Sequence, residues 1–290
     1  MNQQQSICSQ AREKTRAKRA ATQVFSFLTL RAAAFVNCAA LVIACVFLFV
    51  NGIGALNIDF VLDSPREMMT SGGVFPCLVG TFLLAAGAIA IALPFGVACA
   101  VWLNEYGKQG PVVDIVRLSV ANLAGVPSIV FGLFGLAFFV TALGFNVSLL
   151  SGILTLAVLT LPVIINTTEE ALKQVPRSWR DASLALGATK SQTIGRIVLP
   201  SALPGILTGA ILAVARAAGE TSAVMFTAAV FYTPKLPESV WSSVMALPYH
   251  MYVLATAGTE IEKTRPMQYG TGLLLVVLVF AMNLIAILIR

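Results

Sequence analysis

The chain has 290 residues, of which 58% are hydrophobic and only 11% are charged, and its mean hydropathy is +0.86. About a quarter of the residues in a soluble globular domain are charged, so this composition excludes that class. The net charge is +6. Its distribution, described below, indicates an orientation in a membrane and does not favour a nucleic-acid partner.

Long uncharged runs predict membrane-spanning helices, because a helix needs about 20 residues to cross about 30 Å of hydrocarbon. Four such runs hold one, one, two and one spans in chain order: 32–58, 68–104, 118–168 and 266–289. A further span, 203–230, contains charged residues. The sequence therefore predicts an all-α integral membrane protein with six transmembrane helices.

The basic residues predict the orientation of these spans. One cluster lies near the N-terminus and another lies between the fourth and fifth spans: Arg12, Lys14, Arg16, Lys18, Arg19, then Lys173, Arg177, Arg180, Lys190 and Arg196. Cytoplasmic loops carry an excess of Lys and Arg, so we expect both clusters in the cytoplasm. Six spans then return the C-terminus to the cytoplasm. Residues 1–30 should form a flexible or interfacial tail.

The expected helices follow from the uncharged runs, in chain order: 32–56, 74–103, 115–140, 149–166, 203–230 and 266–289. An external loop at 57–73 follows the first helix, and a cytoplasmic helix follows the fourth and reaches Pro176. The second should kink at Pro94. The third contains a polar break between Asn122 and Ser128, which is either a simple kink or the lining of a cavity.

The external segment 231–268 contains an uncharged stretch, 240–256, which we interpret as a surface or re-entrant helix because it is short for a span. His250 is the only histidine, and it has no Cys, Asp or Glu at ligand spacing, so we predict a structural residue and no metal site. The five cysteines form no CxxC pair and predict no disulfide framework: Cys8, Cys38, Cys45, Cys77 and Cys99.

The polar segment 181–200 between the fourth and fifth spans has strong local signals. Ser178 predicts a helix N-cap. Gly187 stands where a helix C-cap needs a positive φ, and Thr189 followed by Gln192 predicts a capping box. A second short helix should end at Leu199–Pro200. The segment is thus expected to form a helix, a glycine corner and another helix.

We expect no catalytic residues in this chain. Residues 187–191 resemble part of a phosphate-binding P-loop, but Thr189 stands where that motif needs a glycine before Lys190. A Gly-rich dinucleotide motif and a Ser/His/Asp set are also absent from the sequence.

The same segment carries a family pattern, E-A-A-x3-G-x9-I-x-L-P, at seven positions: Asp181, Ala182, Ser183, Gly187, Ile197, Leu199 and Pro200. It resembles the permease subunits of bacterial ABC importers, with Asp181 in place of Glu and Ser183 in place of Ala. The resemblance implies the architecture of type I importer permeases, in which residues 169–200 form a coupling loop that docks on a cytoplasmic ATPase. The alternative is an ordinary amphipathic cytoplasmic loop.

The fifth expected helix carries small residues at every fourth position, which predicts close helix packing: Ser201, Gly205, Gly209, Ala213 and Ala217. Arg216 and Glu220 lie four residues apart and should share one helix face. Charges within a span are costly, so they mark either an ion pair or a pathway. Either the two residues neutralise each other, or the guanidinium of Arg216 meets an oxyanion.

A second resemblance favours the oxyanion. Residues 216–221, Arg-Ala-Ala-Gly-Glu-Thr, and residues 122–132 are similar to the phosphate-specific permeases, and residues 226–228 and 247–252 look like the PstA type more than the PstC type. This resemblance implies a substrate pathway for phosphate with five candidate residues: Arg216, Glu220, Thr221, Asn122 and Ser128.

The resemblance also implies partners. They are a second, PstC-like permease, a PstB-like ATPase dimer that holds ATP and Mg, and a periplasmic phosphate-binding protein. This chain would then hold no cofactor or metal and would lie in lipid, in the bacterial inner membrane. The expected domains are the tail 1–30, the first helix and its loop 31–73, and the permease domain 74–290. A permease for molybdate or sulfate remains an alternative. A secondary carrier is disfavoured, because it has no use for an ATPase-docking loop.

Overall fold

The computed structural model describes the backbone of residues 2–69, 71–108, 110–257 and 261–289. Side chains are described for the same residues except 2–22, 24–25, 68, 261–263 and 289. Contacts divide the chain into two units, Met1–Asn51 and Gly52–Arg290, and each is described by itself.

The first unit consists of one helix, α1, whose bounds are Asn2–Gly52. Its apolar part lies within the candidate span Ser26–Ala55. Phe35 is 75% exposed and Leu41 is 66% exposed, as expected of side chains that face lipid. The expected tail 1–30 is helical from Asn2 onwards. Its place in the cytoplasm stays a prediction.

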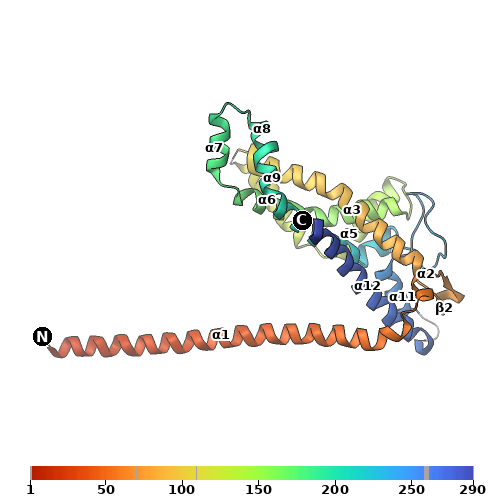
Figure 1. The fold of residues 1–290 in the computed structure, drawn as a ribbon, viewed down its shortest axis with the longest axis horizontal. Helices are drawn as coiled ribbons and strands as arrows, with labels where there is room; N and C mark the ends of the chain where they lie inside the picture. The colour runs from red at the N-terminus through yellow and green to blue at the C-terminus, as the bar shows by residue number, and fades with distance from the viewer. Residues whose placement is uncertain (1, 70, 109, 258–260, 290) are drawn as a thin grey trace. The chain divides into compact units, whose positions relative to one another are not determined.

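The second unit begins with short elements and continues with the helices of a bundle (Figure 1). The short elements are η1 (Ile53–Ala55), α2 (Ile58–Leu62), β1 (Pro65–Arg66), η2 (Glu67–Met69) and β2 (Ser71–Gly72), with β1 and β2 antiparallel. The next are α3 (Phe75–Val101), η3 (Trp102–Tyr106), α4 (Pro111–Ala124), α5 (Ser128–Gly135), η4 (Leu136–Ala142) and α6 (Leu149–Gln174). The last are α7 (Arg177–Ala185), α8 (Lys190–Thr193), η5 (Ile194–Val198), α9 (Leu199–Gly219), α10 (Ser222–Thr227), α11 (Leu247–Thr256) and α12 (Ile261–Ile289).

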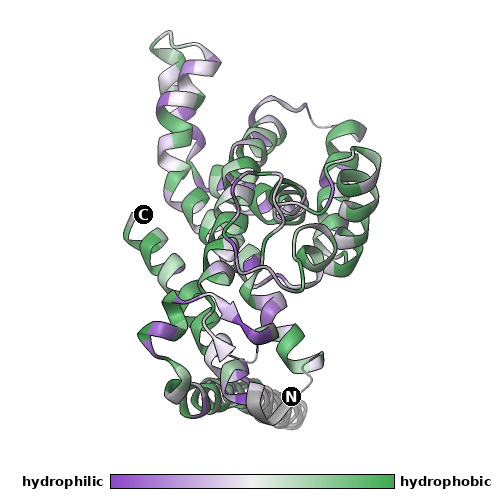
Figure 2. Cartoon of the chain, turned by 90° about the vertical axis from the view of Figure 1, so that its right-hand side faces the viewer, coloured by the Kyte–Doolittle hydropathy of each residue, from purple (hydrophilic) through white to green (hydrophobic). Residues whose placement is uncertain are grey.

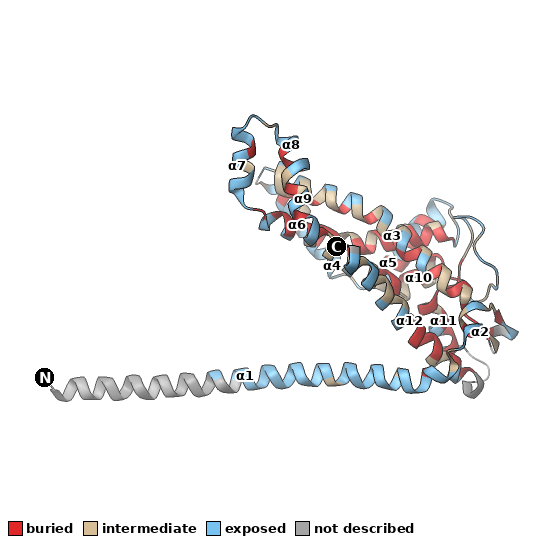
Figure 3. Ribbon diagram, in the orientation of Figure 1, coloured by how far each residue is buried: buried red, intermediate tan, exposed pale blue. Residues whose placement is uncertain are grey.

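Helix α6 lies at the centre of this unit and packs against α3, α5, α9 and α10. Buried residues follow α6 along most of its length (Figure 3). The small residues of α9 allow the close approach that the sequence predicted: an added Cβ at Gly205 would meet Ala171, and one at Gly209 would meet Thr167. Because lipid is as apolar as these side chains, van der Waals packing holds the helices together.

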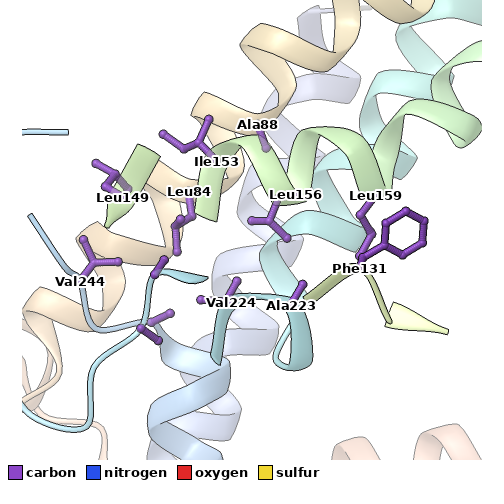
Figure 4. Close-up of a cluster of buried hydrophobic side chains, with 13 residues drawn as sticks. Leu84, Ala88, Phe131, Leu149, Ile153, Leu156, Leu159, Ala223, Val224 and Val244 are labelled. Carbon is purple, nitrogen blue, oxygen red and sulfur yellow. The ribbon is translucent and has the colours of Figure 1, made fainter. Parts of the chain in front are cut away.

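A large apolar cluster joins α6 to three other helices (Figure 4). Leu84 comes from α3, Phe131 from α5, Leu156 from α6 and Val224 from α10. All four side chains are less than 9% exposed. Phe131 and Val224 lie in the helices that follow the two breaks in the spans, so this core holds the starts of α5 and α10 in place.

In the part of the chain that the structure describes, five helices are long and apolar enough to cross a membrane, and α4–α5 with η4 make a sixth span only if the bent pair counts as one. The expected single helix 115–140 is wrong, because Pro111–Ala124 and Ser128–Ala142 meet at 103°. Pro127 has no N–H and disfavours helical backbone at the residue before it, which accounts for the break.

The fourth and fifth expected helices also have different bounds. Helix α6 continues to Gln174, so the expected separate cytoplasmic helix after residue 166 is a continuation of the span. The expected helix 203–230 is wrong, since α9 ends at Gly219 and α10 begins at Ser222. Between them Glu220 is extended, with φ −74° and ψ 123°.

The segment 240–256 was expected to form a surface or re-entrant helix, and in the structure its helix is shorter than expected and partly buried. Only Leu247–Thr256 is helical, as α11, and Met245 and Leu247 are buried. The Leu247 N–H donates a hydrogen bond of 2.8 Å to Thr81 Oγ1 on α3, and Gly80 leaves room for the Met245 carbonyl. The segment is thus part of the core.

Candidate functional site

The segment from α7 to α8 turns at a glycine corner. Gly187 has φ +83°, as the sequence predicted, and an added Cβ would meet no atom within 4 Å. The Gly187 N–H donates to the Leu184 carbonyl at 3.0 Å and the Ala188 N–H donates to the Ser183 carbonyl at 3.2 Å. These two bonds form a Schellman motif, in which glycine takes the left-handed position without a steric penalty.

The two helix starts agree only in part with the sequence. The capping box is confirmed: the Thr189 hydroxyl accepts from the Gln192 backbone N–H at 3.3 Å, and the side-chain Oε1 of Gln192 accepts from the Thr189 backbone N–H at 2.9 Å. The expected N-cap at Ser178 is wrong, because α7 begins at Arg177 with Pro176 at its N-cap. A proline has no N–H to satisfy and its φ suits a helix start.

The expected end of the second helix at Leu199–Pro200 is also wrong. Residues Lys190–Gly219 form one continuous candidate span. The five-residue π-helical segment η5 leads into α9, and Pro200 lies in the first turn of α9. A wider π-type turn accommodates a residue that cannot donate a hydrogen bond. Any movement of α8 therefore passes directly into α9.

The seven pattern residues occupy different surfaces. Asp181, Ala182, Gly187 and Pro200 are exposed, and Ile197 and Leu199 are half-buried. Ser183 is buried, and its hydroxyl lies 2.9 Å from the Thr193 hydroxyl on α8. Alanine at this position could not make that bond, so Ser183 fastens the two helices together.

Apolar side chains near the corner face outward. Leu186 is 89% exposed, Trp179 is 52% exposed and Leu184 is 48% exposed. The two helices project past the end of the bundle (Figure 1), and hydrophobic and polar residues alternate over them (Figure 2). An exposed apolar surface of this kind on a rigid element indicates a protein-binding site.

Arg180 joins α7 to a turn far away in the sequence. Its Nη2 lies 2.7 Å from Glu105 Oε1, and its Nε lies 3.2 Å from the same oxygen. Nη1 also donates to the Val175 carbonyl at 2.6 Å, and Nη2 donates to the Leu172 carbonyl at 2.9 Å. The side chains of Arg180 and Glu105 are only 16% and 8% exposed. One guanidinium thus binds η3, α6 and α7.

Lys190 adds a second link from α8 to the same turn. Its ammonium donates to the Glu105 carbonyl and lies 4.9 Å from the centroid of the Tyr106 ring. A cleft of about 420 Å³ opens between these elements, and its lining carries both signs of charge: Asn104, Glu105, Lys173, Val175, Arg177, Arg180 and Asp181.

Glu169 makes a related connection at the end of α6. Its carboxylate, 8% exposed, lies 2.9 Å from Arg117 Nη2 on α4 and 3.2 Å from Lys173 Nζ. Two cations stabilise the charge of this nearly buried carboxylate, and removing both would leave it unpaired at a high cost. Helices α3 and α4 are therefore both joined to the α6–α7 region by an ion pair.

The candidate pathway residue Arg216 is half-buried in the last turn of α9. Among the described residues, no hydrogen bond or ion pair joins it to Glu220 or to any other side chain. The extended backbone at Glu220 ends the helix, so the i, i+4 relation assumed for the two residues does not hold. Glu220 Oε1 instead accepts from the Ala223 N–H at 3.4 Å, in the first turn of α10.

The remaining pathway residues lie at the two breaks. Thr221 and Ser128 are half-buried, and Asn122 is exposed in the last turn of α4. An added Cβ at Gly132 on α5 would meet the Ser222 carbonyl at 2.9 Å, so α5 crosses α10 beside the Glu220–Thr221 break. These breaks lie on helices that pack together, but among the described residues neither Asn122 nor Ser128 forms a hydrogen bond or ion pair with Arg216.

Sequence reasoning missed Glu105, Arg180 and Glu169. Glu105 and Arg180 lie 75 residues apart, and no local periodicity encodes such a pair. The break after α9 did have a signal, since Gly219 followed by Glu220 and Thr221 is typical of a helix end and a new start.

This chain is similar to a family of transport proteins and to several of its members. Residues 92–290 match the family described as binding-protein-dependent transport system inner membrane component. The probable ABC transporter permease protein YqgI of Bacillus subtilis is 33% identical over 266 residues, 86% of this chain and 90% of the relative. Phosphate transport system permease protein PstA 1 of Mycobacterium tuberculosis is 40% identical over 221 residues, 76% of this chain and 71% of the relative.

Solved structures show the same fold. A chain of the MetNI methionine ABC transporter, in inward-facing conformations, has a TM-score of 0.54 and 24% identity over 75% of this chain and 92% of its own length. A bacterial ABC transporter that imports alginate has a TM-score of 0.57 and 13% identity over 76% of this chain and 78% of its own.

Fold and similarities together define a transport subunit of the ABC-importer class, with several spans in the inner membrane. The chain belongs to the family of binding-protein-dependent transport system inner membrane components.

Proposed function

We propose that this chain is a PstA-like permease subunit of a phosphate importer, working with a PstC-like permease, a PstB-like ATPase dimer and a periplasmic phosphate-binding protein. The relatives named PstA support the substrate, at 40% identity in Mycobacterium tuberculosis and 32% in Xylella fastidiosa. ATP and Mg are held by the ATPase, and this chain carries the pathway and the coupling element. Its N- and C-termini lie in the cytoplasm.

One observation carries the anion pathway: Arg216 is a half-buried cation, near the end of a membrane span, with no partner among the described residues. An unpaired charge in a span is costly unless water or a ligand meets it. A planar guanidinium offers two parallel donors, which suit the oxygens of phosphate. Phosphate passing the α9–α10 break would find this cation free to bind it.

Coupling to ATP hydrolysis would use the α7–α8 corner. Leu186 and Trp179 offer an apolar surface to an ATPase, and the Schellman motif, the capping box and the Ser183–Thr193 bond keep that surface rigid. Because α8 is continuous with α9, closure of the ATPases would move the helix that carries Arg216.

The test is phosphate uptake by cells that express the complex, normalised to assembled complex. Arg216→Met should assemble yet lose uptake, and Arg216→Lys should also be impaired, since an ammonium cannot provide the guanidinium fork. The double variant Arg216→Met with Glu220→Gln should remain inactive. Arg66→Gln, which removes an exposed external arginine, serves as the matched control and should transport normally.

The results separate the alternatives. Near-normal uptake by the double variant would reduce Arg216 to a structural residue. Uptake of molybdate or sulfate, with no uptake of phosphate, would favour a permease for another oxyanion. Uptake that persists in the absence of any ATPase would favour a secondary carrier.

A further inference from the structure

We propose that Glu105 is a positioning residue that joins α3 to the α7–α8 corner, so that movement of the corner is transmitted to α3 as well as to α9. This inference rests on the proposed coupling of the corner to an ATPase. Along the chain, α7 is connected to α6 through Val175–Pro176 and to α9 through α8, whereas α3 has no nearby covalent link to it.

The contacts supply the missing link. Glu105 makes two contacts with the corner. Its side-chain carboxylate binds the Arg180 guanidinium of α7, and its backbone carbonyl accepts from the Lys190 ammonium of α8. The corner is therefore held to η3 at two points, one on each of its helices. Helix α3 runs without interruption into η3 in the candidate span Phe75–Tyr106, so η3 cannot move independently of it.

We call the contacts between Glu105 and the corner the joint, and Arg180 makes the joint rigid. It donates to Glu105 through Nε and Nη2, and to the Val175 and Leu172 carbonyls through Nη1 and Nη2. A guanidinium bound on several sides has a single orientation, and a pair shielded from water is weakly screened by salt. A movement of α7 is therefore transmitted to α3 without first changing the conformation of the Arg180 side chain.

The chemistry also distinguishes Glu105 from the other carboxylates in this region. Glu170 is 67% exposed, and its one ion pair within the described part of the chain is with Lys173, a surface contact of little energetic value. Asp181 is exposed in the cleft and forms no hydrogen bond or ion pair with any other residue that the structure describes. Among the described residues, Glu105 is the acidic residue that contacts both helices of the corner, α7 through its carboxylate and α8 through its backbone carbonyl.

The joint can be tested by measuring the distance between its two sides in the purified complex with its own partner subunits. Spin labels at the exposed positions Lys108, just past η3, and Ala185, at the end of α7, report whether the two segments move together. In the otherwise unsubstituted chain, the distance should be narrow and unchanged between the nucleotide-free and ATP-bound states. Glu105→Gln should broaden it and make it depend on nucleotide. Glu170→Gln is the matched control and should behave like the unsubstituted chain.

Function gives the second readout. Glu105→Gln should hydrolyse ATP at a normal rate but transport about tenfold less phosphate per ATP, the factor expected for one lost charge-assisted hydrogen bond. A purely structural role would instead lower assembly, hydrolysis and uptake together. Where Glu105→Gln does not assemble, Arg180→Lys keeps the charge but loses the fork, and it should show the same broadened distance.

Two outcomes would overturn the proposal: a Lys108–Ala185 distance that changes with nucleotide in the unsubstituted chain, or one that stays narrow in both Glu105→Gln and Arg180→Lys. The distance measurement uses no phosphate. A complex that hydrolyses ATP and keeps this distance fixed, yet carries another anion, would therefore refute the proposed substrate and leave the joint intact.

Discussion

His250 is a buried histidine in α11, and among the described residues neither of its ring nitrogens has a hydrogen-bond partner. The loss of water around the ring lowers its pKa from 6.5 to about 4. A neutral imidazole is therefore the native form. Its burial beside the apolar cluster of Met245, Leu247 and Val253 gives it a packing role.

This burial predicts a pH-dependent stability. Between pH 6.5 and 4 the unfolded chain binds a proton at His250 that the folded chain does not, so the free energy of unfolding should fall as the pH is lowered. The loss should reach about 3 kcal/mol near pH 4 and be absent above pH 7. The measurement is urea unfolding of the purified chain in detergent across this range.

His250→Leu supplies the comparison, because it fills a similar volume and cannot titrate. The difference between the two proteins isolates His250 from the carboxylates that titrate in the same range. An identical pH slope in both would mean that the ring is hydrated in the folded state.

Residues whose role is set by their immediate neighbours were predictable from the sequence. Gly187 and Thr189 belong to local motifs, and both adopt the expected geometry. Arg216 was placed in a span correctly, but its pairing with Glu220 assumed a continuous helix that the structure interrupts. The Glu105–Arg180 pair depends on the packing of distant segments, so the sequence alone could not predict it.

At the scale of elements, the glycine corner sets the angle between α7 and α8. Gly187→Val should strain the corner by at least about 1 kcal/mol, because φ +83° is unfavourable for a residue with a Cβ. An added Cβ at Gly187 meets nothing within 4 Å, so the effect should come from the backbone alone and insertion should be normal. Phosphate uptake and ATPase binding should both decrease.

Gly195→Val is the matched control, since Gly195 also has open space around it but not a left-handed φ. Uptake should be nearly normal in this variant. Normal uptake by Gly187→Val would contradict the role of the corner in coupling.

The spans themselves were predictable because hydrocarbon demands long uncharged helices. Their interruptions were harder to place. The sequence predicted a polar break near Pro127. The angle of 103° between the two helices that meet there depends on how Phe131 and Val224 pack, which the sequence does not show. The segment around Met245 has a span-like composition, yet it is buried against α3 without crossing as a helix.

At the scale of the whole second unit, its two ends differ in character. The short elements α2 and β2 lie at one end, and α7 and α8 lie at the other (Figure 1). The basic residues gather at the α7–α8 end, which the positive-inside bias assigns to the cytoplasm. The acidic residues Asp59, Asp63 and Glu67 lie at the opposite end.

This orientation can be tested with single cysteines in a chain whose five native cysteines are replaced. An impermeant thiol reagent added to intact cells should label a cysteine at Glu238, which is exposed in the segment before α11, but not one at Lys190 in α8. Lys190→Cys should become reactive once the membrane is opened, which controls for its position near the Tyr106 ring. Labelling of Lys190→Cys on intact cells, or of neither cysteine, would mean that the unit is inverted or that the number of spans between them is even. Labelling of Lys190→Cys would place the corner outside, where it cannot meet a cytoplasmic ATPase, whereas labelling of neither cysteine would leave the corner inside and contradict the span predicted between the two positions.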